Sequence, residues 1–433
     1  MSFRSFLDKL DKEGQLVKVK EPVSKKLEAS GIISELDYKP VLFEKIKESD
    51  FKVAGNICTS KRVIANYFDL GPEELIVKMI KAIDSPSKPE IVNTGPCQEV
   101  TEQTVDLDKL PILFHCAEDG GNYLSSGVFI VRDLEYGQNL SYHRGMQLDK
   151  NKFVIRVVAH RDFDTYLKRN NGELDVAVCI GNPVNVLLTA ATSVEIEKDE
   201  LGIANSLESL KIVKAKTVDV YVPVESEFIL EGRVTKETHA EGPFVDLTET
   251  YDTVREQPIF EVKKITHRKD AIWQALLPGK LEHRILMGTP REPTIYKEVN
   301  KVCRCVDVNI TPGGCSWLHA IVKIDKQSEK DGRLAIDAAF QGHKSLKHVF
   351  IVDNDIDISN PLEVEWALAL RFQGNKDLVI KEKQIGSTLD KSADPQTKET
   401  TKVGFDLTKP LGERSKLFEK VKFPKVDLHK YIG

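Results

Sequence analysis

Apolar and polar residues follow three different patterns along the chain, and the first of them extends over roughly the first hundred residues. The spacing of apolar residues predicts a helix over Ser5–Leu16, and short apolar runs predict buried strands at Val41–Phe43 and Val53–Ile57. Pro72, followed by two glutamates, is typical of the first turn of a helix. Residues 1–100 are therefore expected to form an α/β segment, with a breaker-rich linker at Ser85–Pro89.

The middle of the chain, residues 101–310, changes to a period of two, which is typical of strands. Glycine, asparagine and proline separate the expected strands, which are Gly127–Arg132, Lys152–Ala159, Asp175–Ile180, Thr217–Pro223, Phe228–Val234 and Gln257–His267. One probable helix, Val194–Leu210, interrupts them. Ser193 is one candidate for its cap, and a later start near Asp199 is the alternative.

The last part, residues 311–433, returns to alternating strands and helices. A strand is expected at His348–Val352, and Asn360 and Pro361 mark the start of a helix over Leu362–Phe372. A terminal helix is expected at Ser415–Val421. The fold class is thus mixed α/β, with a β-rich central domain between two α/β parts.

Composition narrows the class of protein. Of the 433 residues, 41% are hydrophobic and 30% are charged, which indicates a globular chain. The net charge of −5, with both signs interspersed, argues against a nucleic acid partner. No run of about 20 apolar residues is long enough to span a membrane, and the N-terminus lacks the apolar core of a signal peptide. We expect a cytoplasmic protein.

Seven cysteines fit reduced thiols in such a compartment. Cys303, Cys305, Cys315 and His319 form the one local cluster, but zinc sites usually carry Cys-x-x-Cys pairs. The favoured interpretation is packed structural cysteines that share a strand face, and a metal site remains the alternative.

The sequence motifs of phosphate-binding loops, dinucleotide-binding sites, serine hydrolases and zinc proteases are absent. Two polar segments are the remaining candidates for catalytic residues. The segments are Gly137–Met146 and His239–Asp246. A Glu-Arg-Asp group is suited to proton transfer, since Arg⁺ keeps one carboxylate ionised. Within each segment, however, Asn139 and Arg144, like Glu241 and Asp246, are five residues apart and would lie on opposite faces of a regular strand. Ordinary surface or turn residues are therefore the alternative, unless the nearby glycines distort the backbone.

Several longer motifs, in order along the chain, resemble the UbiD family of prenylated-flavin-dependent decarboxylases. They are FLDKLDKEGQL, SSGVFIVRD (125–133), NLSYHRGMQ (139–147), VVAH (157–160), CIGNPVNVLL (179–188), DELGIANSL (199–207), EGPFVD (241–246), HVFIVDNDID (348–357) and TTKVGFDLTKP (400–410). The resemblance implies a split β-barrel flavin-binding domain in the centre and a C-terminal α/β oligomerisation domain that ends in a helix.

The resemblance also implies a cofactor site. Asn139, His160 and Glu200 match family residues that hold a divalent metal at the phosphate of prenylated FMN. This mostly oxygen donor set suits Mn²⁺ or Mg²⁺. Lys402 matches a lysine that contacts the same phosphate, the Ser141–Tyr142 backbone would line the flavin, and a K⁺ ion commonly lies nearby in the family. Taken alone, His160 and Glu200 read as ordinary strand-end and helix-surface residues.

By the same resemblance, the catalytic residues are Arg144, Glu241 and Asp246. Arg144 would orient the substrate carboxylate, Glu241 would fix Arg144, and Asp246 would protonate the carbon that loses CO₂. Asp246 departs from relatives that carry Glu there, and Glu249 is an alternative donor. His143 and His319 are pocket candidates, with packing as an equal alternative.

The compact chain most resembles archaeal family members that convert trans-anhydromevalonate 5-phosphate to isopentenyl phosphate. The alternatives are an aromatic or polyprenyl-hydroxybenzoate acid as substrate, an inactive flavin-binding relative, and a flavin reductase. The resemblance further implies a homo-oligomer, either a dimer or a hexamer, and a flavin prenyltransferase that supplies the cofactor.

Overall fold

The computed structural model describes residues 1–421, 423–427 and 430–431. Two compact units make up the chain. The first contains Met1–Pro293 and Ile310–Trp317, and the second contains Thr294–Asn309 and Leu318 onward. No helix among the described residues is both long and apolar enough to cross a membrane. The division into residues 1–100, 101–310 and 311–433 stays a prediction.

The N-terminal part of the first unit is an α/β layer, as the sequence pattern predicts. Its four-stranded sheet has the order β1 (Val17–Val19), β2 (Val41–Phe43), β3 (Lys52–Gly55) and β18 (Ile272–Ala275). The helices of this part are α1 (Phe3–Lys12), α2 (Glu28–Leu36), α3 (Lys61–Tyr67) and α4 (Pro72–Asp84). The N-terminal helix thus starts earlier than expected, because the Ser2 hydroxyl caps it by accepting the Ser5 N–H, and it ends four residues before Leu16.

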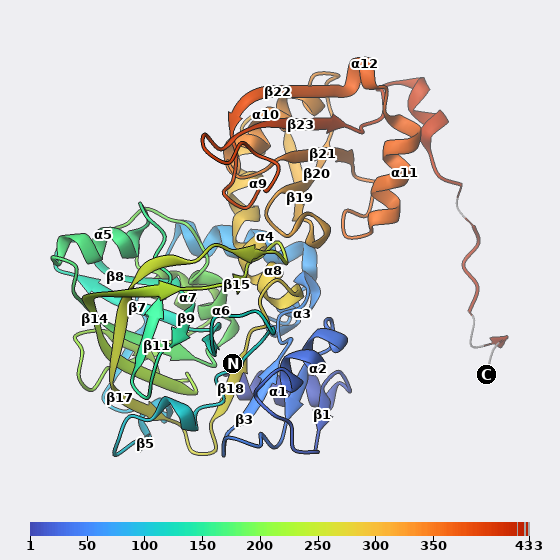
Figure 1. Cartoon of the computed structure of the whole chain (residues 1–433). Helices are drawn as coiled ribbons and strands as arrows, with labels where there is room; N and C mark the ends of the chain where they lie inside the picture. Colours follow the sequence, from blue (N-terminus) through green and yellow to red (C-terminus); the bar gives the residue numbers. More distant parts are fainter. Residues whose placement is uncertain (422, 428–429, 432–433) are drawn as a thin grey trace. The chain divides into compact units, whose positions relative to one another are not determined.

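A nine-stranded sheet forms the centre of the first unit (Figure 1). Its order is β6 (Tyr123–Leu124), β9 (Gly145–Gln147), β10 (Lys152–Ile155), β17 (Arg255–His267), β14 (Phe228–Glu241), β11 (Leu174–Ile180), β7 (Val128–Asp133) and β8 (Gly137–Tyr142), and β5 (Val100–Thr101) pairs with β17. All these pairs are antiparallel. The sheet confirms the β-rich centre.

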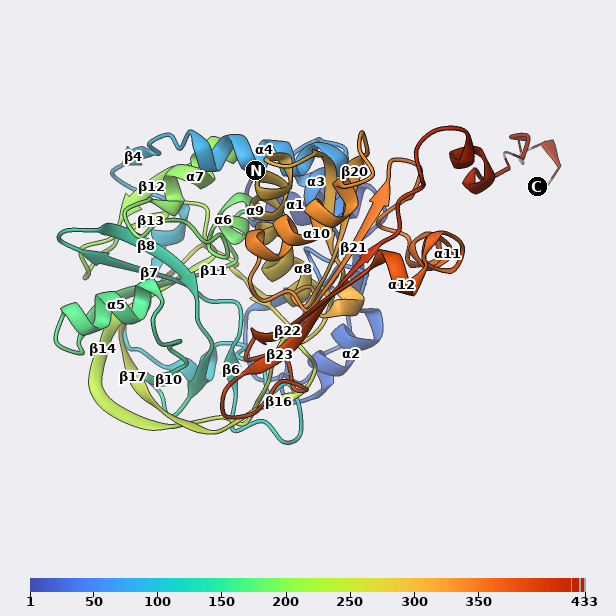
Figure 2. The same cartoon turned by 90° about the horizontal axis from the view of Figure 1, so that it is seen from above.

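Two strands, β14 and β17, are much longer than the rest and curve through this sheet (Figures 1 and 2). Their pairing shifts register between Glu231 and Gly232 and again between Val234 and Thr238, and such bulges bend a strand and increase its twist. At the far end Glu241 pairs with Arg255. The bend therefore delivers a glutamate and an arginine together to one end of the long hairpin.

Smaller elements complete the first unit. A three-stranded sheet has the order β13 (Tyr221–Pro223), β12 (Lys211–Lys214) and β4 (Glu90–Val92), and β15 (Phe244–Val245) pairs with β16 (Tyr251–Asp252). The helices are α5 (Asp162–Arg169), α6 (Val184–Thr189), α7 (Glu200–Leu207) and α8 (Leu281–Gly288), with 3₁₀ turns at Pro96–Gln98, Leu107–Lys109, Thr289–Arg291 and Pro312–Gly314. Of the two predicted starts for the helix after residue 193, the later one is correct, because the Asp199 carboxylate accepts the Leu201 N–H.

The second unit is built on a five-stranded mixed sheet. Its order is β19 (Arg304–Ile310), β20 (His319–Asp325), β21 (His348–Asp353), β23 (Glu399–Asp406) and β22 (Leu378–Ile385), and the helices are α9 (Glu292–Asn300), α10 (Asp331–Gly342), α11 (Pro361–Arg371) and α12 (Gly374–Asp377). Asn360 caps α11 through the Leu362 N–H, as predicted.

The expected terminal helix over Ser415–Val421 is wrong. The described residues there contain only a 3₁₀ helix, Glu413–Phe418, none of whose residues is buried. Leu417 is 79% exposed and Val421 is 81% exposed. A short helix in water needs a packed apolar face to be stable, and this segment has none within its own chain.

The local cysteine cluster does not form a metal group. Cys303 precedes β19, and Cys305 is a buried residue of that strand that forms no disulfide. Among the described residues, no three His, Cys, Asp or Glu side chains come together in a way that would hold a metal ion. Packing is therefore the better interpretation of Cys305.

Candidate active site

Arg144 is the centre of a charged network in the first unit. Its Nε and Nη2 atoms donate to the two carboxylate oxygens of Glu241 at 2.9 and 3.0 Å, a bidentate pair. Nη2 also donates to Oδ2 of Asp252 at 3.0 Å. The structure thus joins Arg144 to Glu241, as predicted, and adds a second carboxylate that sequence reasoning missed.

Irregular backbone makes this contact feasible. Strand β8 ends at Tyr142 and β9 begins at Gly145, so that Arg144 lies in the break between them. Glu241 is the last residue of β14, directly before Gly242, whose φ is +108°. The regular alternation that would place Arg144 opposite Asn139, and Asp246 opposite Glu241, therefore does not continue through either position.

The network keeps its groups charged. Burial alone would lower the pKa of the Arg144 guanidinium, but the hydrogen bonds and charge of Glu241 outweigh it and raise the pKa. For Asp252, burial favours the neutral carboxyl group and would raise its pKa. The neighbouring Arg255 and Arg144 nevertheless lower this pKa to about 2. A guanidinium fixed in this way is suited to hold a substrate carboxylate.

Asp246 lies near this network without an ion pair to Arg144. Its Oδ1 accepts the Leu247 N–H at 2.7 Å, and its charge contributes to the raised pKa of Arg144. Glu249, the alternative proton donor, pairs with Lys280 at 3.2 Å and Arg284 at 3.0 Å. Burial alone would raise the pKa of Glu249, but Lys280 and Arg284 outweigh it and lower the pKa. The carboxylate therefore stays ionised. Asp246 is the better placed of the two.

Three further side chains of this region were not predicted from the sequence. The Tyr123 hydroxyl donates to Glu241 at 3.1 Å, the Phe244 ring lies 5.1 Å from the Arg144 guanidinium, and His283 is close enough to Asp246 and Arg144 for their charges to act on it. Burial lowers the pKa of His283 to about 4, so the imidazole is neutral near pH 7. Of these three residues, only Phe244 lies next to a recognisable sequence feature, the turn Gly242–Pro243.

Asn139 and Glu200 meet in a second, buried part of the first unit. The Asn139 amide N–H donates to Glu200 Oε1 at 2.9 Å, and the Leu140 N–H donates to Oε2 at 3.1 Å. Glu200 is the first residue of α7, which the Asp199 cap fixes. Strand alternation places Asn139 and Ser141 on one face of β8, and the Ser141 hydroxyl lies 3.4 Å from Asn139 Oδ1.

This pair fits a cation. Burial, with further contributions from Asp199 and Asp162, raises the pKa of Glu200 to about 8. Within the described chain, Glu200 has no ion-pair partner. A buried carboxylate next to an amide and other carboxylates is a favourable environment for a divalent ion with a preference for oxygen ligands.

The remaining predicted cofactor residues are less closely joined. His160 is exposed, with φ +63°, and its backbone N–H donates to Asp164 at 2.8 Å. Asp162, two residues later, is near enough to affect the pKa of Glu200, so the loop that carries His160 runs near the buried carboxylate. Tyr142 donates from its hydroxyl to the Leu187 carbonyl at 3.1 Å. Lys402 belongs to the second unit, where its ammonium donates to the Lys344 carbonyl.

The two candidate pocket histidines have packing partners. His143 is buried, with its Nδ1 2.9 Å from the Arg156 carbonyl and its Nε2 3.0 Å from the Ser141 hydroxyl. His319, in the second unit, lies with Nε2 at 2.7 Å from Nδ1 of His348. These contacts favour the packing interpretation for both.

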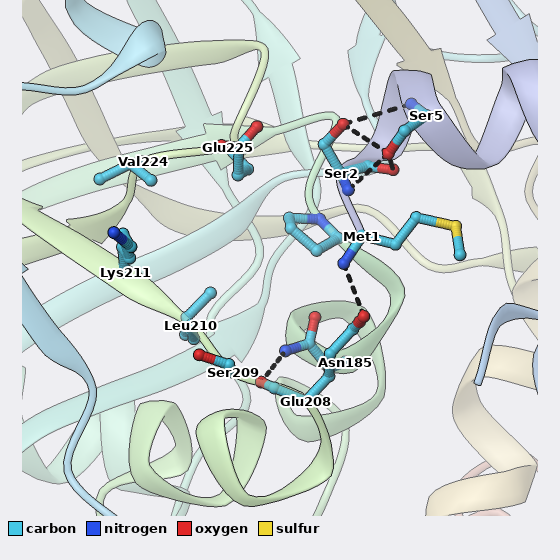
Figure 3. Close-up of a pocket in the computed structure, with 11 residues that line it drawn as sticks. Met1, Ser2, Ser5, Asn185, Glu208, Ser209, Leu210, Lys211, Val224 and Glu225 are labelled. Atoms are coloured by element: carbon cyan, nitrogen blue, oxygen red, sulfur yellow. Dashed lines mark hydrogen bonds and ion pairs between the residues drawn. The ribbon is translucent and has the colours of Figure 1, made fainter.

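A separate pocket lies next to the start of the chain (Figure 3). The Met1 ammonium pairs with Glu208 at 2.6 Å, and the Asn185 amide N–H donates to the Glu208 carbonyl at 3.1 Å. None of the predicted site residues lines this pocket. It is therefore distinct from the charged network around Arg144.

Most of the chain matches the domains of one protein family in sequence. Residues 7–83, 90–281 and 284–407 match the N-terminal domain, the Rift-related domain and the C-terminal domain of 3-octaprenyl-4-hydroxybenzoate carboxy-lyase. The chain belongs to the UbiD family. This confirms the resemblance and places the chain among carboxy-lyases.

Among curated relatives, the anhydromevalonate phosphate decarboxylase of Methanothermobacter thermautotrophicus is 40% identical over 426 residues, which cover 96% of this chain and 99% of the relative. The protein of the same name from Methanocaldococcus jannaschii is 40% identical over 410 residues and covers 93% and 96%. Both are similar to this chain over nearly their whole length.

Solved structures agree with this assignment. The UbiD-class enzyme HmfF from Pelotomaculum thermopropionicum, in complex with FMN, matches with a TM-score of 0.95 and 30% identity over all of both chains. An evolved dimeric form of that enzyme in complex with prFMN matches with a TM-score of 0.91 and 30% identity, again over all of both chains. The mixed α/β fold is thus that of UbiD-class enzymes.

Proposed function

We propose that this chain is a prenylated-FMN-dependent decarboxylase of a phosphorylated α,β-unsaturated acid, with trans-anhydromevalonate 5-phosphate as the substrate and isopentenyl phosphate as the product. The carrying observation is the Arg144 guanidinium, which is fixed by Glu241 and Asp252 close to Asp246. The names of the archaeal relatives support the choice of substrate.

In this proposal each side chain has a separate role. Arg144 binds and orients the substrate carboxylate, and Glu241 and Asp252 keep the guanidinium charged and in place. Asp246 supplies the proton that replaces CO₂ on the substrate carbon. Prenylated FMN, when bound, accepts the electron pair that cleavage of the carbon–carboxylate bond leaves.

The cofactor end of the site is assigned to other residues. Asn139 and Glu200, with His160 from the adjacent loop, would hold Mn²⁺ or Mg²⁺ at the cofactor phosphate, and Ser141 and Tyr142 would line the flavin. Lys402 is assigned to the same phosphate, and K⁺ is a further expected ion. We also assign the split β-barrel of the family to the nine-stranded antiparallel sheet.

Two properties of the whole protein belong to the proposal. We expect a homo-oligomer in the cytoplasm, either a dimer or a hexamer, and the dimeric form of the evolved HmfF enzyme supports assembly. A flavin prenyltransferase would supply the cofactor.

The decisive experiment uses protein produced together with a flavin prenyltransferase. Wild type is expected to release CO₂ from trans-anhydromevalonate 5-phosphate, and Asp246→Asn is expected to lower kcat by roughly 10²- to 10⁴-fold, because it removes the proton donor. Glu249→Gln is the matched control on the same loop: it weakens the contacts with Lys280 and Arg284 but leaves the proposed donor in place, so it should lower kcat far less. Full turnover by Asp246→Asn would refute the assignment, and CO₂ release only from aromatic acids would favour the alternative substrate class. Bound flavin without any CO₂ release would favour the inactive relative.

A further inference from the structure

Asp252 is surrounded by three arginines. Its Oδ2 atom accepts from Arg144 Nη2 at 3.0 Å, forms an ion pair with Arg255 Nη1 at 2.7 Å, and lies 3.8 Å from Nε of Arg156. The Asp252 side chain is only 13% exposed, and that of Arg156 is 22% exposed. One half-buried carboxylate therefore faces three guanidiniums.

Three guanidiniums share two carboxylates in this cluster. Glu241 is the second carboxylate of the network, and it is engaged with both oxygens by Arg144. Asp252 is shared by all three guanidiniums, so Arg156 and Arg255 have only part of one carboxylate, while the charge of Asp246 acts on Arg144 from nearby. Burial lowers the pKa of Arg156, and the nearby charges of Arg255 and Arg144 lower it further. An additional anion at Arg156 and Arg255 would relieve this repulsion.

The backbone places these arginines next to the catalytic one. Arg156 directly follows β10, and its N–H donates to the Arg144 carbonyl at 3.0 Å. The next amide, that of Val157, donates to Gln257 Oε1 on β17 at 2.7 Å, and Arg255 is the first residue of that strand. Strand pairing therefore fixes the guanidiniums of Arg156 and Arg255 near Arg144.

We propose that Arg156 and Arg255 form a second anion subsite, adjacent to Arg144, that binds the phosphate group of the substrate. The proposal rests on the proposed function and extends it: Arg144 would take the carboxylate, and this pair would take the phosphate at the other end of the acid. Guanidinium groups bind phosphate oxygens in pairs and remain charged at all working pH values. A phosphomonoester carries close to two negative charges near pH 7, which the two guanidiniums of Arg156 and Arg255 can match.

The phosphate of the cofactor is the other source of the same chemistry. Arg156 and Arg255 share the Asp252 carboxylate with Arg144, whereas none of the described residues assigned to the cofactor end contacts that carboxylate. The position of the pair next to Arg144 therefore favours the substrate over the cofactor.

The test is calorimetric titration of FMN-saturated protein with inorganic phosphate. The variants are Arg156→Gln and Arg255→Gln, and Arg255→Lys, which keeps the charge, guards against a folding defect. Each glutamine variant is expected to weaken phosphate binding by roughly 10- to 100-fold, because it removes a charge-assisted contact. Arg233→Gln is the matched control, since this arginine pairs with Glu173 and Asp175 elsewhere on the sheet. With substrate, the same variants should raise KM far more than they lower kcat.

Each other outcome has a clear meaning. Unchanged phosphate affinity in both glutamine variants would overturn the subsite. A parallel loss of FMN affinity, measured by fluorescence titration of flavin-free protein, would assign the pair to the cofactor and overturn the substrate assignment. Weakened phosphate binding in a protein that releases CO₂ from no phosphorylated acid would support the subsite and refute the proposed function.

Discussion

Glu200 is a buried carboxylate whose charge depends on its immediate surroundings. Its carboxylate is satisfied by an amide and a backbone N–H, but no cation of the described chain pairs with it. The raised pKa of about 8 means that, without a metal, the group is largely protonated at neutral pH. A divalent ion must therefore displace a proton when it binds.

The pH dependence of stability follows from this shift. In metal-free protein, the folded chain keeps a proton on Glu200 between its ordinary pKa of 4.5 and about 8, while the unfolded chain has lost it. Stability should therefore fall as the pH rises through this range, by an amount on the order of a few kcal/mol. Glu200→Gln should remove this contribution.

Thermal unfolding at pH 5 and pH 8, with and without Mn²⁺, measures the effect. We expect Mn²⁺ to raise the Tm of wild type strongly at pH 8, less at pH 5, and to leave Glu200→Gln unchanged. Equal Mn²⁺ effects on both proteins would contradict the assignment of Glu200 as a ligand.

The sequence predicted the residues of the Arg144–Glu241 pair but not their environment. These two residues were assigned through family motifs, whereas periodicity alone placed Arg144 opposite Asn139 and Asp246 opposite Glu241. No sequence pattern pointed to Asp252. Its contact with Arg144 depends on the pairing of Phe244 with Asp252, in a hairpin whose two strands are each only two residues long. Such a short register is set by tertiary contacts and cannot be derived from an alternation pattern.

Among the elements, local capping chemistry was the most reliable guide. Pro72 starts α4, Asp199 caps α7 and Asn360 caps α11, and each was a predicted helix start. The terminal helix was wrong for the opposite reason, because helical spacing at Ser415–Val421 is not accompanied by packing. Caps act within a few residues, so they can be recognised in the sequence, whereas packing partners cannot.

The Asp199 cap links an element to the proposed metal site. Asp199→Ala should cost about 1 kcal/mol of stability through the lost cap, and it should also weaken Mn²⁺ binding, because the first turn of α7 positions Glu200. Asn360→Ala, at the cap of α11, is the control with a similar stability cost. Denaturant unfolding and Mn²⁺ titration of both variants check this. Equal Mn²⁺ affinity in the two variants would show that the cap does not position the ligand.

At the scale of the whole molecule, the second unit leaves large apolar side chains exposed. Leu362 is 74% exposed and Leu417 is 79% exposed. The segments that carry them are joined by an ion pair between Lys420 and Glu363 at 3.0 Å, and exposed apolar side chains on neighbouring segments are commonly covered by a partner in solution. We therefore expect these residues to contribute to the homo-oligomer.

Light scattering after size exclusion tests this expectation. Wild type should have a multiple of the chain mass, and Leu362→Asp or Leu417→Asp should shift it toward the single chain. Leu134→Asp, at a fully exposed position of the first unit, is the control and should leave the mass unchanged. A single-chain mass for wild type would contradict the prediction.

The ten residues between Glu241 and Asp252 are attached at both ends to the same guanidinium. Asp246 lies within this loop, and Lys280 and Arg284 hold its tip through Glu249. A loop whose two ends share one anchor can exchange its interior residues during evolution while the anchor stays in place. Substrate preference can therefore diverge through the interior of this loop, one substitution at a time, without loss of the Arg144 anchor.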